Sequence, residues 1–407
     1  MIRRGLLPLL VALLALAACG GGGEEVEPTP SPSPAVVLPS PTPEPTPTAT
    51  PAVETLAFIR DGDVWLIDAD GSDERRLNLS DVQSFSWVSS NELDVVIGGD
   101  QPRYQLVPLE GNVRELLFPA GGSWSRDGSL YVVPVDQQLV VFERDGGEIV
   151  RLEVGPEADE CPPPPPSYPS PIPDRLAFGQ PVFSPDGEGV LLAVHCYLLS
   201  GAYNFYGSIY EVSLDGAVNR PLQGPKTGPQ VNLRGLTGPR FSPDGRRIAS
   251  AFIDGFSLCP WEKGLTVADA DGANSRGLSV AALTELYKQE PSPDTFGGVV
   301  GYDWSPASDG IAASFDVSFC DVTEGALGLV IEGLYILKLD GSLEEKLADG
   351  PTHSPAWSPS GRFITYVTGK LFGAEPTGAP TIRLLDLTTR QVVDLAQGNS
   401  PAWQPQP

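Results

Sequence analysis

The sequence predicts an all-β fold built from repeats. Three observations support this: a recurring turn phrase, short apolar runs between the turns, and complementary half-repeats at the two ends. The phrase is an aromatic residue followed by Ser-Pro-Asp-Gly, complete at 183–187 and 241–245. Degenerate copies surround five tryptophans, namely Trp87, Trp124, Trp304, Trp357 and Trp403. Recurrence at this spacing, with several strands per unit, is typical of a single β-propeller made of four-stranded antiparallel sheets.

Each repeat is interpreted as short strands separated by tight turns. After the phrase at 241–245, apolar runs follow at 247–252 and 265–268, and a second turn follows at 269–272. In such phrases proline presets φ, aspartate bonds to nearby backbone N–H groups, and glycine adopts positive φ. The repeated aspartates are therefore interpreted as turn formers and not as catalytic groups. The aromatic residues are interpreted as packing between neighbouring sheets.

The two ends of the chain indicate how the ring closes. Residues 56–79 carry the later strands of a unit without an opening phrase, and residues 401–405 supply an opening with nothing after it. The C-terminal strand is therefore predicted to complete the N-terminal blade, which leaves few sheet edges exposed. Counting the copies gives seven blades, with six or eight as the alternatives.

The Ser-Pro-Asp-Gly turns, together with a downstream Asp-x-Asp-Gly as at 68–71, resemble the TolB-type, WD-like β-propeller repeat. The resemblance covers nearly the whole chain after residue 54. Some copies depart from the pattern: Arg126 replaces the proline after Trp124, Ser360 replaces the aspartate after Trp357, and Trp87 has lost most of its turn. The resemblance implies a propeller, and by itself it is only a fold analogy for function.

Residues 1–18 are predicted to be a signal peptide. The positively charged residues Arg3 and Arg4 are followed by an apolar run at 5–18. This run is shorter than the roughly 20 residues of a membrane-spanning helix. The sequence Leu-Ala-Ala-Cys at 16–19 resembles the bacterial lipobox, which implies that Cys19 carries a diacylglycerol; an ordinary signal with an incidental cysteine is the alternative. Two acyl chains suffice for stable anchoring. The protein is then expected on the outer face of the cytoplasmic membrane or on the outer membrane, facing the periplasm or the exterior.

Residues 19–54 are predicted to be a lipidated, disordered stalk, and residues 55–407 the propeller domain. The stalk is rich in Pro, Thr, Ser and Glu and offers almost nothing large and apolar to bury. The net charge is −26, and loss of Arg3 and Arg4 with the signal makes it −28. Such acidity argues against nucleic-acid binding and is interpreted as a source of solubility. The membrane is expected to be contacted through the lipid alone.

Four further cysteines are candidates for disulfides, because an exported protein can oxidise them: Cys161, Cys196, Cys259 and Cys320. The last three follow the second apolar run of successive repeats and are expected on one face of the ring. Neighbouring positions favour Cys161 with Cys196 and Cys259 with Cys320, and Cys196 with Cys259 is the competing pairing. No C-x-x-C pair occurs, so no metal site is predicted.

The sequence offers no motif for a catalytic or cofactor site. It has only two histidines, His195 and His353, and no G-x-S-x-G, H-E-x-x-H or P-loop. The Asp-rich stretches at 68–73 and 269–274 lack the third carboxylate and the distal glutamate of a calcium loop. No catalytic residue and no cofactor is predicted, and a function other than catalysis is favoured.

Aromatic residues in the variable inserts are the candidate partner-binding residues: Tyr203, Phe205, Tyr206, Phe256 and Trp261. Exposed aromatic side chains often anchor recognition surfaces, and function concentrates on loops; the alternative is that they cover their own blades. The expected function is a monomeric, lipid-anchored binding or scaffolding module for an envelope protein or cell-wall component. The alternatives are a hydrolase or lyase using carboxylates of the central channel, and a solute-binding or sensory lipoprotein with a closed apolar pocket.

Overall fold

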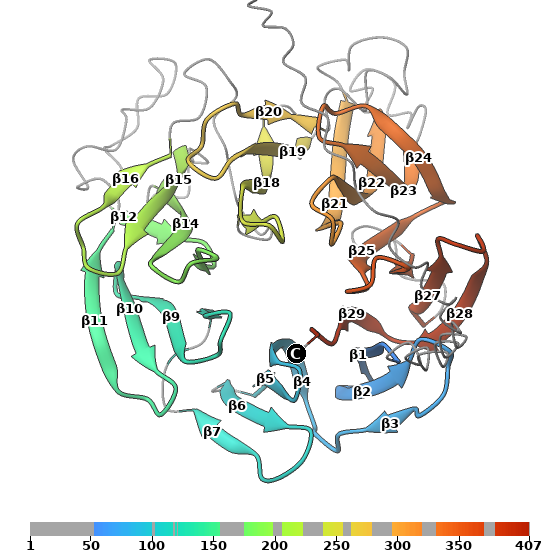
Figure 1. Ribbon diagram of the computed structural model, residues 1–407, viewed down its shortest axis with the longest axis horizontal. Coiled ribbons are helices and arrows are strands. Elements are labelled where there is room, and N and C mark those ends of the chain that lie inside the picture. Colours follow the sequence, from blue (N-terminus) through green and yellow to red (C-terminus); the bar gives the residue numbers. More distant parts are fainter. Residues whose placement is uncertain are drawn as a thin grey trace, which may run out of the picture. The chain divides into compact units, whose positions relative to one another are not determined.

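The computed structural model describes residues 53–99, 102–116, 119, 121–154, 175–197, 206–222, 239–254, 262–278, 295–319, 331–369 and 379–406. These ranges form strands β1 to β29, which are grouped into seven blades around a central axis (Figure 1). The predicted all-β propeller of seven blades is therefore confirmed. Within the described part, no helix is long and apolar enough to cross a membrane. The predicted signal peptide and almost all of the predicted stalk lie outside the described residues and stay predictions.

Blades 1 to 3 contain the first eleven strands and the last one. From the axis outward, blade 1 comprises β29 (Asn399–Trp403), β1 (Thr55–Arg60), β2 (Asp63–Asp68) and β3 (Arg75–Arg76). Blade 2 comprises β4 (Val82–Ser89), β5 (Glu92–Ile97), β6 (Arg103–Pro108) and β7 (Arg114–Leu116). Blade 3 comprises β8 (Ser123–Trp124), β9 (Leu130–Val135), β10 (Gln138–Glu143) and β11 (Glu148–Glu153).

Blades 4 to 7 complete the ring. In blade 4, β12 (Arg175–Phe178) and β13 (Val182–Phe183) both pair with β14 (Gly189–Tyr197), followed by β15 (Tyr206–Ser213) and β16 (Asn219–Pro221). Blade 5 comprises β17 (Arg240–Phe241), β18 (Arg247–Asp254), β19 (Glu262–Asp269) and β20 (Arg276–Gly277). Blade 6 comprises β21 (Thr295–Trp304), β22 (Gly310–Phe319), β23 (Ile331–Lys338) and β24 (Leu343–Asp349), and a parallel contact between β19 and β21 joins it to blade 5. Blade 7 comprises β25 (Thr352–Trp357), β26 (Phe363–Thr368), β27 (Thr381–Asp386) and β28 (Val392–Gln397).

The antiparallel order gives the ring two faces with different connections. The turn face carries the turns between the first and second strands of blades 2 to 7 and the outer hairpins. The opposite face, called the insert face, carries the connections from the second strand to the third and from one blade to the next. In blades 1 to 3 the second and third strands are joined by 61–62, 98–102 and 136–137. In blades 4 to 7 they are joined by the longer segments 198–205, 255–261, 320–330 and 369–380.

The repeated phrase forms a turn that its own side chains cap. In blade 4, Ser184 Oγ donates to Asp186 Oδ1 (2.5 Å) and accepts from Gly189 N (2.9 Å). Asp186 Oδ1 also accepts from Glu188 N (3.0 Å), and the equivalent residues of blade 5 repeat the pattern. The Ser184 hydroxyl is the main cause that lowers the pKa of Asp186. These aspartates are turn formers, as predicted.

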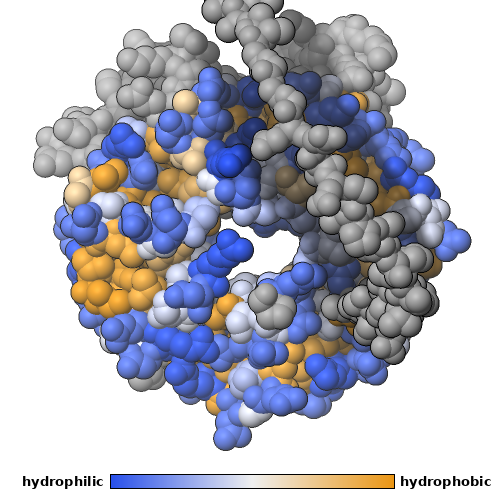
Figure 2. All heavy atoms as spheres, in the orientation of Figure 1, coloured by the Kyte–Doolittle hydropathy of each residue, from blue (hydrophilic) through white to orange (hydrophobic). Residues whose placement is uncertain are grey.

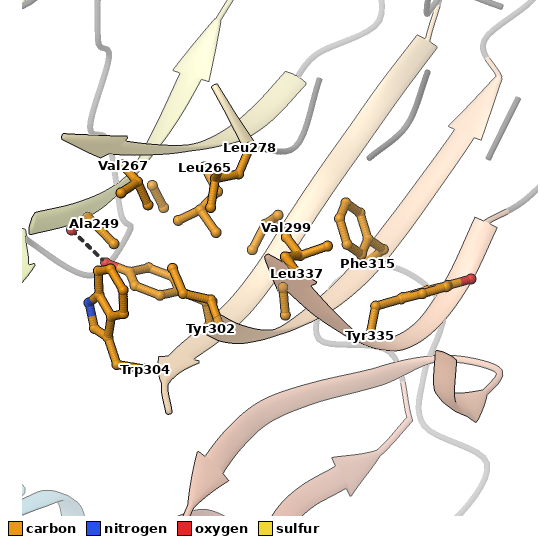
Figure 3. Close-up of a cluster of buried hydrophobic side chains, with 13 residues drawn as sticks. Ala249, Leu265, Val267, Leu278, Val299, Tyr302, Trp304, Phe315, Tyr335 and Leu337 are labelled. Carbon is orange, nitrogen blue, oxygen red and sulfur yellow. Dashed lines mark hydrogen bonds between the residues drawn. The ribbon is translucent and has the colours of Figure 1, made fainter. Parts of the chain in front are cut away.

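The aromatic residue before each turn packs against the preceding blade, also as predicted. The indole N–H groups of three tryptophans donate to carbonyls on the innermost strand of that blade: Trp87 to Ala402 (3.1 Å), Trp304 to Arg240 (3.3 Å) and Trp403 to Ala356 (3.1 Å). Figure 3 shows the boundary of blades 5 and 6, where Tyr302 donates to the Ala249 carbonyl (3.1 Å) beside Leu265 and Val267. Each large apolar side chain buried there contributes about 1.5–3 kcal/mol.

The two ends of the chain share blade 1. Leu56 in β1 lies opposite Trp403 in β29, and Ala57 lies opposite Ala402. Just beyond the strand, Gln404 N donates to the Thr55 carbonyl (2.9 Å). The predicted completion of the N-terminal blade by the C-terminal strand is therefore confirmed.

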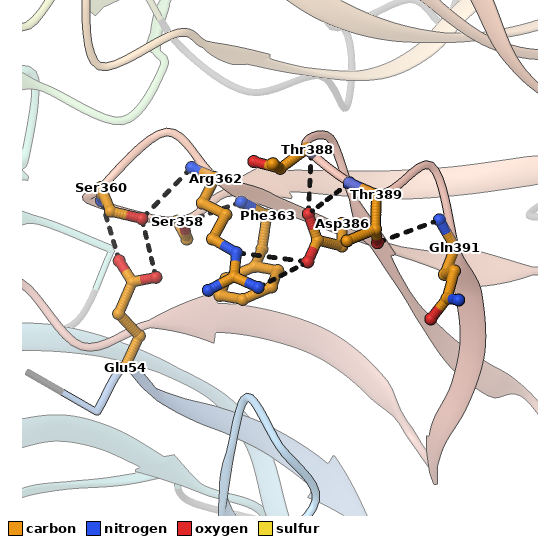
Figure 4. Close-up of polar contacts among 9 residues, drawn as sticks. All are labelled: Glu54, Ser358, Ser360, Arg362, Phe363, Asp386, Thr388, Thr389 and Gln391. Atoms are coloured by element: carbon orange, nitrogen blue, oxygen red, sulfur yellow. Dashed lines mark hydrogen bonds and ion pairs between the residues drawn. The ribbon is translucent and has the colours of Figure 1, made fainter. Parts of the chain in front are cut away.

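A second link joins blade 1 to the turn of blade 7 (Figure 4). Ser360 stands there in place of the aspartate, and Glu54, just before β1, supplies a carboxylate. Glu54 Oε1 accepts from Ser360 N and Oε2 accepts from Ser360 Oγ, both at 2.8 Å. The Ser358 hydroxyl lies 3.2 Å from that of Ser360 and accepts from Phe363 N (3.1 Å). A residue 306 positions away in the sequence thus completes this turn.

Removing the Glu54 carboxylate is expected to weaken closure only while Ser360 is present. Glu54→Ala should lower the free energy of unfolding by about 1 kcal/mol, because two hydrogen bonds from Ser360 are lost. In a Ser360→Asp background the turn has its own carboxylate, so Glu54→Ala should cost nothing or relieve repulsion. Urea unfolding of the four proteins measures the coupling. An equal cost in both backgrounds would contradict the link.

Two turn glycines give a matched test of packing between turns. Gly245 and Gly187 have φ of 71° and 76°, so alanine is strained at both. A Cβ at Gly245 would also lie 2.7 Å from Pro185 Cγ of the neighbouring turn, whereas a Cβ at Gly187 would meet nothing within 4 Å. Gly245→Ala is expected to lower the melting temperature clearly more than Gly187→Ala does. Equal losses would show that neighbouring turns do not pack on each other.

Candidate functional site

On the insert face, the second strands of blades 4 to 6 extend further from the turn face than those of blades 1 to 3. The second strands β14, β18 and β22 have nine, eight and ten residues, whereas β1, β5 and β9 have six each. All of them begin at the turn face, and each extra residue adds about 3.3 Å of strand. One side of the insert face is therefore raised by the strands themselves and carries three of the four longer connections.

The structure places two of the sequence-predicted residues at this raised side. Tyr206 begins β15 and is the backbone pairing partner of Cys196 in β14. His195 is paired in the same way with Gly207. The other candidates lie outside the described residues: Cys19, Cys161, Tyr203, Phe205, Phe256, Cys259, Trp261 and Cys320. Partner binding, lipidation and disulfide pairing therefore stay predictions.

Asp94 is a titratable group that the sequence analysis missed. It lies in β5, where its Oδ2 accepts from Trp124 Nε1 of blade 3 (3.2 Å). Its Oδ1 is buried and has no hydrogen-bond partner among the described residues. Burial raises the pKa of Asp94 to about 6, and the bond from Trp124 opposes this shift. The signal in the sequence was an acidic residue inside the apolar run Leu93–Ile97.

Asp303 is a second carboxylate outside the turns, and it links three blades. Its Oδ2 accepts from Trp357 N of blade 7 (2.8 Å), and its Oδ1 lies 3.5 Å from the Arg240 guanidinium of blade 5. Burial raises the pKa of Asp303, whereas Arg240 and the Trp357 N–H lower it. Asp94 belongs to blade 2 and Asp303 to blade 6, so the ring does not bring these two carboxylates together.

The centre of the ring is open on the face shown in Figure 2, and hydrophilic residues surround much of the opening. His353 of β25 is largely buried; its Nδ1 lies 3.0 Å from Ser354 Oγ, and burial lowers its pKa. Within the described ranges, no three His, Cys, Asp or Glu side chains gather closely enough to hold a metal ion. This central region therefore resembles an open channel and not a closed apolar pocket.

Asp94 predicts an unusual dependence of stability on pH. Its pKa of about 6 exceeds the ordinary 3.8, so the folded state loses stability as pH rises from about 4 through about 6. Asp94→Asn removes the buried charge and is expected to raise the free energy of unfolding at pH 8 by about 1–3 kcal/mol. At about pH 4 the difference should vanish.

Asp127 serves as the matched control for this measurement. It lies in the turn of blade 3, where the Ser125 hydroxyl is the main cause that lowers its pKa. Its charge therefore stabilises the fold above about pH 4, and Asp127→Asn should destabilise the protein at pH 8. Urea unfolding at both pH values tests the pair, and a loss of stability in both variants at pH 8 would contradict the buried charge at Asp94.

Comparison with known proteins identifies the fold. Neither a scan against protein-family models nor a search of curated proteins finds a match. Among solved structures, the oligogalacturonate lyase of Vibrio parahaemolyticus is similar with a TM-score of 0.53 and 13% identity over 85% of each chain. TolB of Acinetobacter baumannii has a TM-score of 0.42 and 15% identity over 87% of this chain and 67% of TolB. A puromycin hydrolase has a TM-score of 0.40 and 18% identity over 79% of this chain, which spans 55% of the hydrolase. This chain is a seven-bladed β-propeller, and its structural neighbours include TolB and other propeller proteins.

Proposed function

We propose that this chain is a lipid-anchored, extracytoplasmic binding or scaffolding propeller that holds an envelope protein or cell-wall component on its insert face. The observation that carries the proposal is the separation of the two faces. The chain enters the propeller at Glu54 on the turn face, where Glu54 is bound to Ser360. The longer connections of blades 4 to 7 leave from the opposite face.

This separation suits a tethered binding protein. With a lipid on Cys19 and a stalk over 19–54, the tether joins the propeller at the turn face. The insert face is then the one directed away from the membrane and accessible to a partner. The longer strands β14, β18 and β22 raise blades 4 to 6 on that side, and loops on a rigid scaffold are common recognition sites.

The titratable groups of the described region also fit a binding function better than an enzymatic one. Asp94 and Asp303 have raised pKa values, which is a property of many catalytic carboxylates. Each is bound to groups of neighbouring blades, Asp94 to Trp124 and Asp303 to Trp357. Their role in the structure is to join blades. The hydrolase or lyase alternative requires carboxylates that converge on one point of the channel.

Crosslinking and copurification from native membranes test the proposal. The wild-type protein is compared with Cys19→Ala and with a triple variant, Tyr203→Ala/Phe205→Ala/Trp261→Ala. The matched control is Ile149→Ala/Val393→Ala, which removes apolar side chains that are 50% and 47% exposed on the outermost strands of blades 3 and 7. One stoichiometric partner is expected with the wild type and the control, and at least about a tenfold loss with the triple variant. Cys19→Ala should leave the membrane fraction.

Two results would overturn the proposal. If the triple variant retains the partner at wild-type yield, the aromatic residues of the insert face do not bind it. If no protein or cell-wall fragment copurifies with the wild type, binding of an envelope component is wrong. If Cys19→Ala remains in the membrane fraction while the partner is still captured, the anchoring part alone is wrong.

A further inference from the structure

Blade 2 differs from the other blades on the turn face. Its first strand β4 ends at Ser89 and β5 begins at Glu92, so only residues 90–91 join them. In blade 4 the corresponding connection is 184–188. Beside the shortened turn lies a cavity of about 700 Å³ between blades 1, 2 and 3. Its walls include Arg75, Ser89, Asn91, Glu92, Glu110 and Arg144. This volume is typical of a small-ligand site.

Two of the charged groups that line this cavity pair with each other. Arg144 of blade 3 forms a salt bridge with Glu92 of blade 2. Its Nη1 also donates to the Gly128 carbonyl (3.0 Å), and its guanidinium lies 5.9 Å from the centre of the Trp124 ring. Arg144 and Glu92 therefore hold the wall between blades 2 and 3 in place.

Two other charges in the cavity have no ion-pair partner in the described part of the chain. Arg75 is in β3 of blade 1, and Glu110 follows β6 of blade 2. They form no salt bridge with each other either, so their charged atoms are more than 4.0 Å apart. The adjacent Arg76 is different, because it pairs with the buried Asp63. The cavity thus presents one free positive and one free negative group on different blades.

These charges select the class of ligand. Arg75 and Arg144 balance Glu92 and Glu110, so a ligand with a single charge would be attracted by one of the two free groups and repelled by the other. A ligand with both charges would find a complementary group for each of them. Asn91, in the shortened turn of blade 2, also lines the cavity, and its side-chain amide forms no hydrogen bond among the described residues. A guanidinium binds carboxylates well through its paired N–H groups.

We propose that this cavity binds a short peptide with free ends, with its terminal carboxylate on Arg75 and its terminal ammonium on Glu110. The site lies on the turn face and is separate from the inserts, so it goes beyond the proposed function and does not depend on it.

Calorimetric titration of the protein at low ionic strength tests this site with triglycine as the probe. N-acetyl-triglycine lacks the ammonium group, and triglycine amide lacks the carboxylate. Triglycine should bind the wild type, and each blocked peptide should bind about fivefold more weakly or worse. Arg75→Gln should weaken the binding of triglycine to the affinity of triglycine amide, so that this variant no longer distinguishes the two peptides. Glu110→Gln should weaken the binding of triglycine to the affinity of N-acetyl-triglycine, so that this variant no longer distinguishes those two.

Arg103→Gln is the matched control, because Arg103 is an exposed arginine of β6 at the insert-face end of blade 2. The Arg103→Gln variant should bind triglycine with the affinity of the wild type. Because this site is separate from the insert face, Arg75→Gln should still capture a partner in the copurification experiment. Absence of triglycine binding to the wild type would overturn the proposal. So would equal affinities of Arg75→Gln and Arg103→Gln, or equal affinities of the wild type for triglycine and its two blocked forms.

Discussion

The contact between neighbouring blades is the interaction on which the rest of this structure depends. A single four-stranded sheet exposes two apolar faces, and here each face is covered by the next sheet around the ring. The recurring aromatic residue lies at this boundary, and in three blades its indole N–H also bonds to the innermost strand of the preceding blade. Since each blade is covered by both of its neighbours, opening the ring would expose apolar surface on the two end blades. The end blades are therefore the places where extra bonds matter most.

The ring is closed by two links, one between strands and one between side chains. β29 pairs with β1 inside blade 1, and Glu54 completes the turn of blade 7 through Ser360. The chain enters the propeller at Glu54 and leaves it after β29, both at the turn face. The longer strands of blades 4 to 6 extend the opposite, insert face. In the proposed function, the tether therefore joins the domain at the turn face and the insert face is the one that meets a partner.

Several blades depart from the repeat on the turn face, and these departures have different consequences. Ser360 replaces an aspartate and creates a bond to Glu54. Trp124 donates to the side chain of Asp94 instead of to a backbone carbonyl, which places a buried carboxyl between blades 2 and 3. The shortened turn at 90–91 lies beside a cavity with two free charges. Departures from a repeat are thus the positions where a propeller acquires individual properties, because the repeat itself only builds the scaffold.

The sequence by itself determined the repeat, the blade count, the turn chemistry and the closing strand. These features depend on residues close together in the chain, such as Ser184 and Asp186, or on a pattern copied at each blade. The tertiary structure alone decided that Glu54 binds Ser360, that Asp94 is buried against Trp124, and that Arg75 and Glu110 share a cavity. Burial, pKa and ion pairing depend on side chains brought together from different blades. Neighbours in space but distant in sequence leave no local signal, so the fold and the aromatic inserts were predictable, whereas the buried carboxyl groups and the cavity were not.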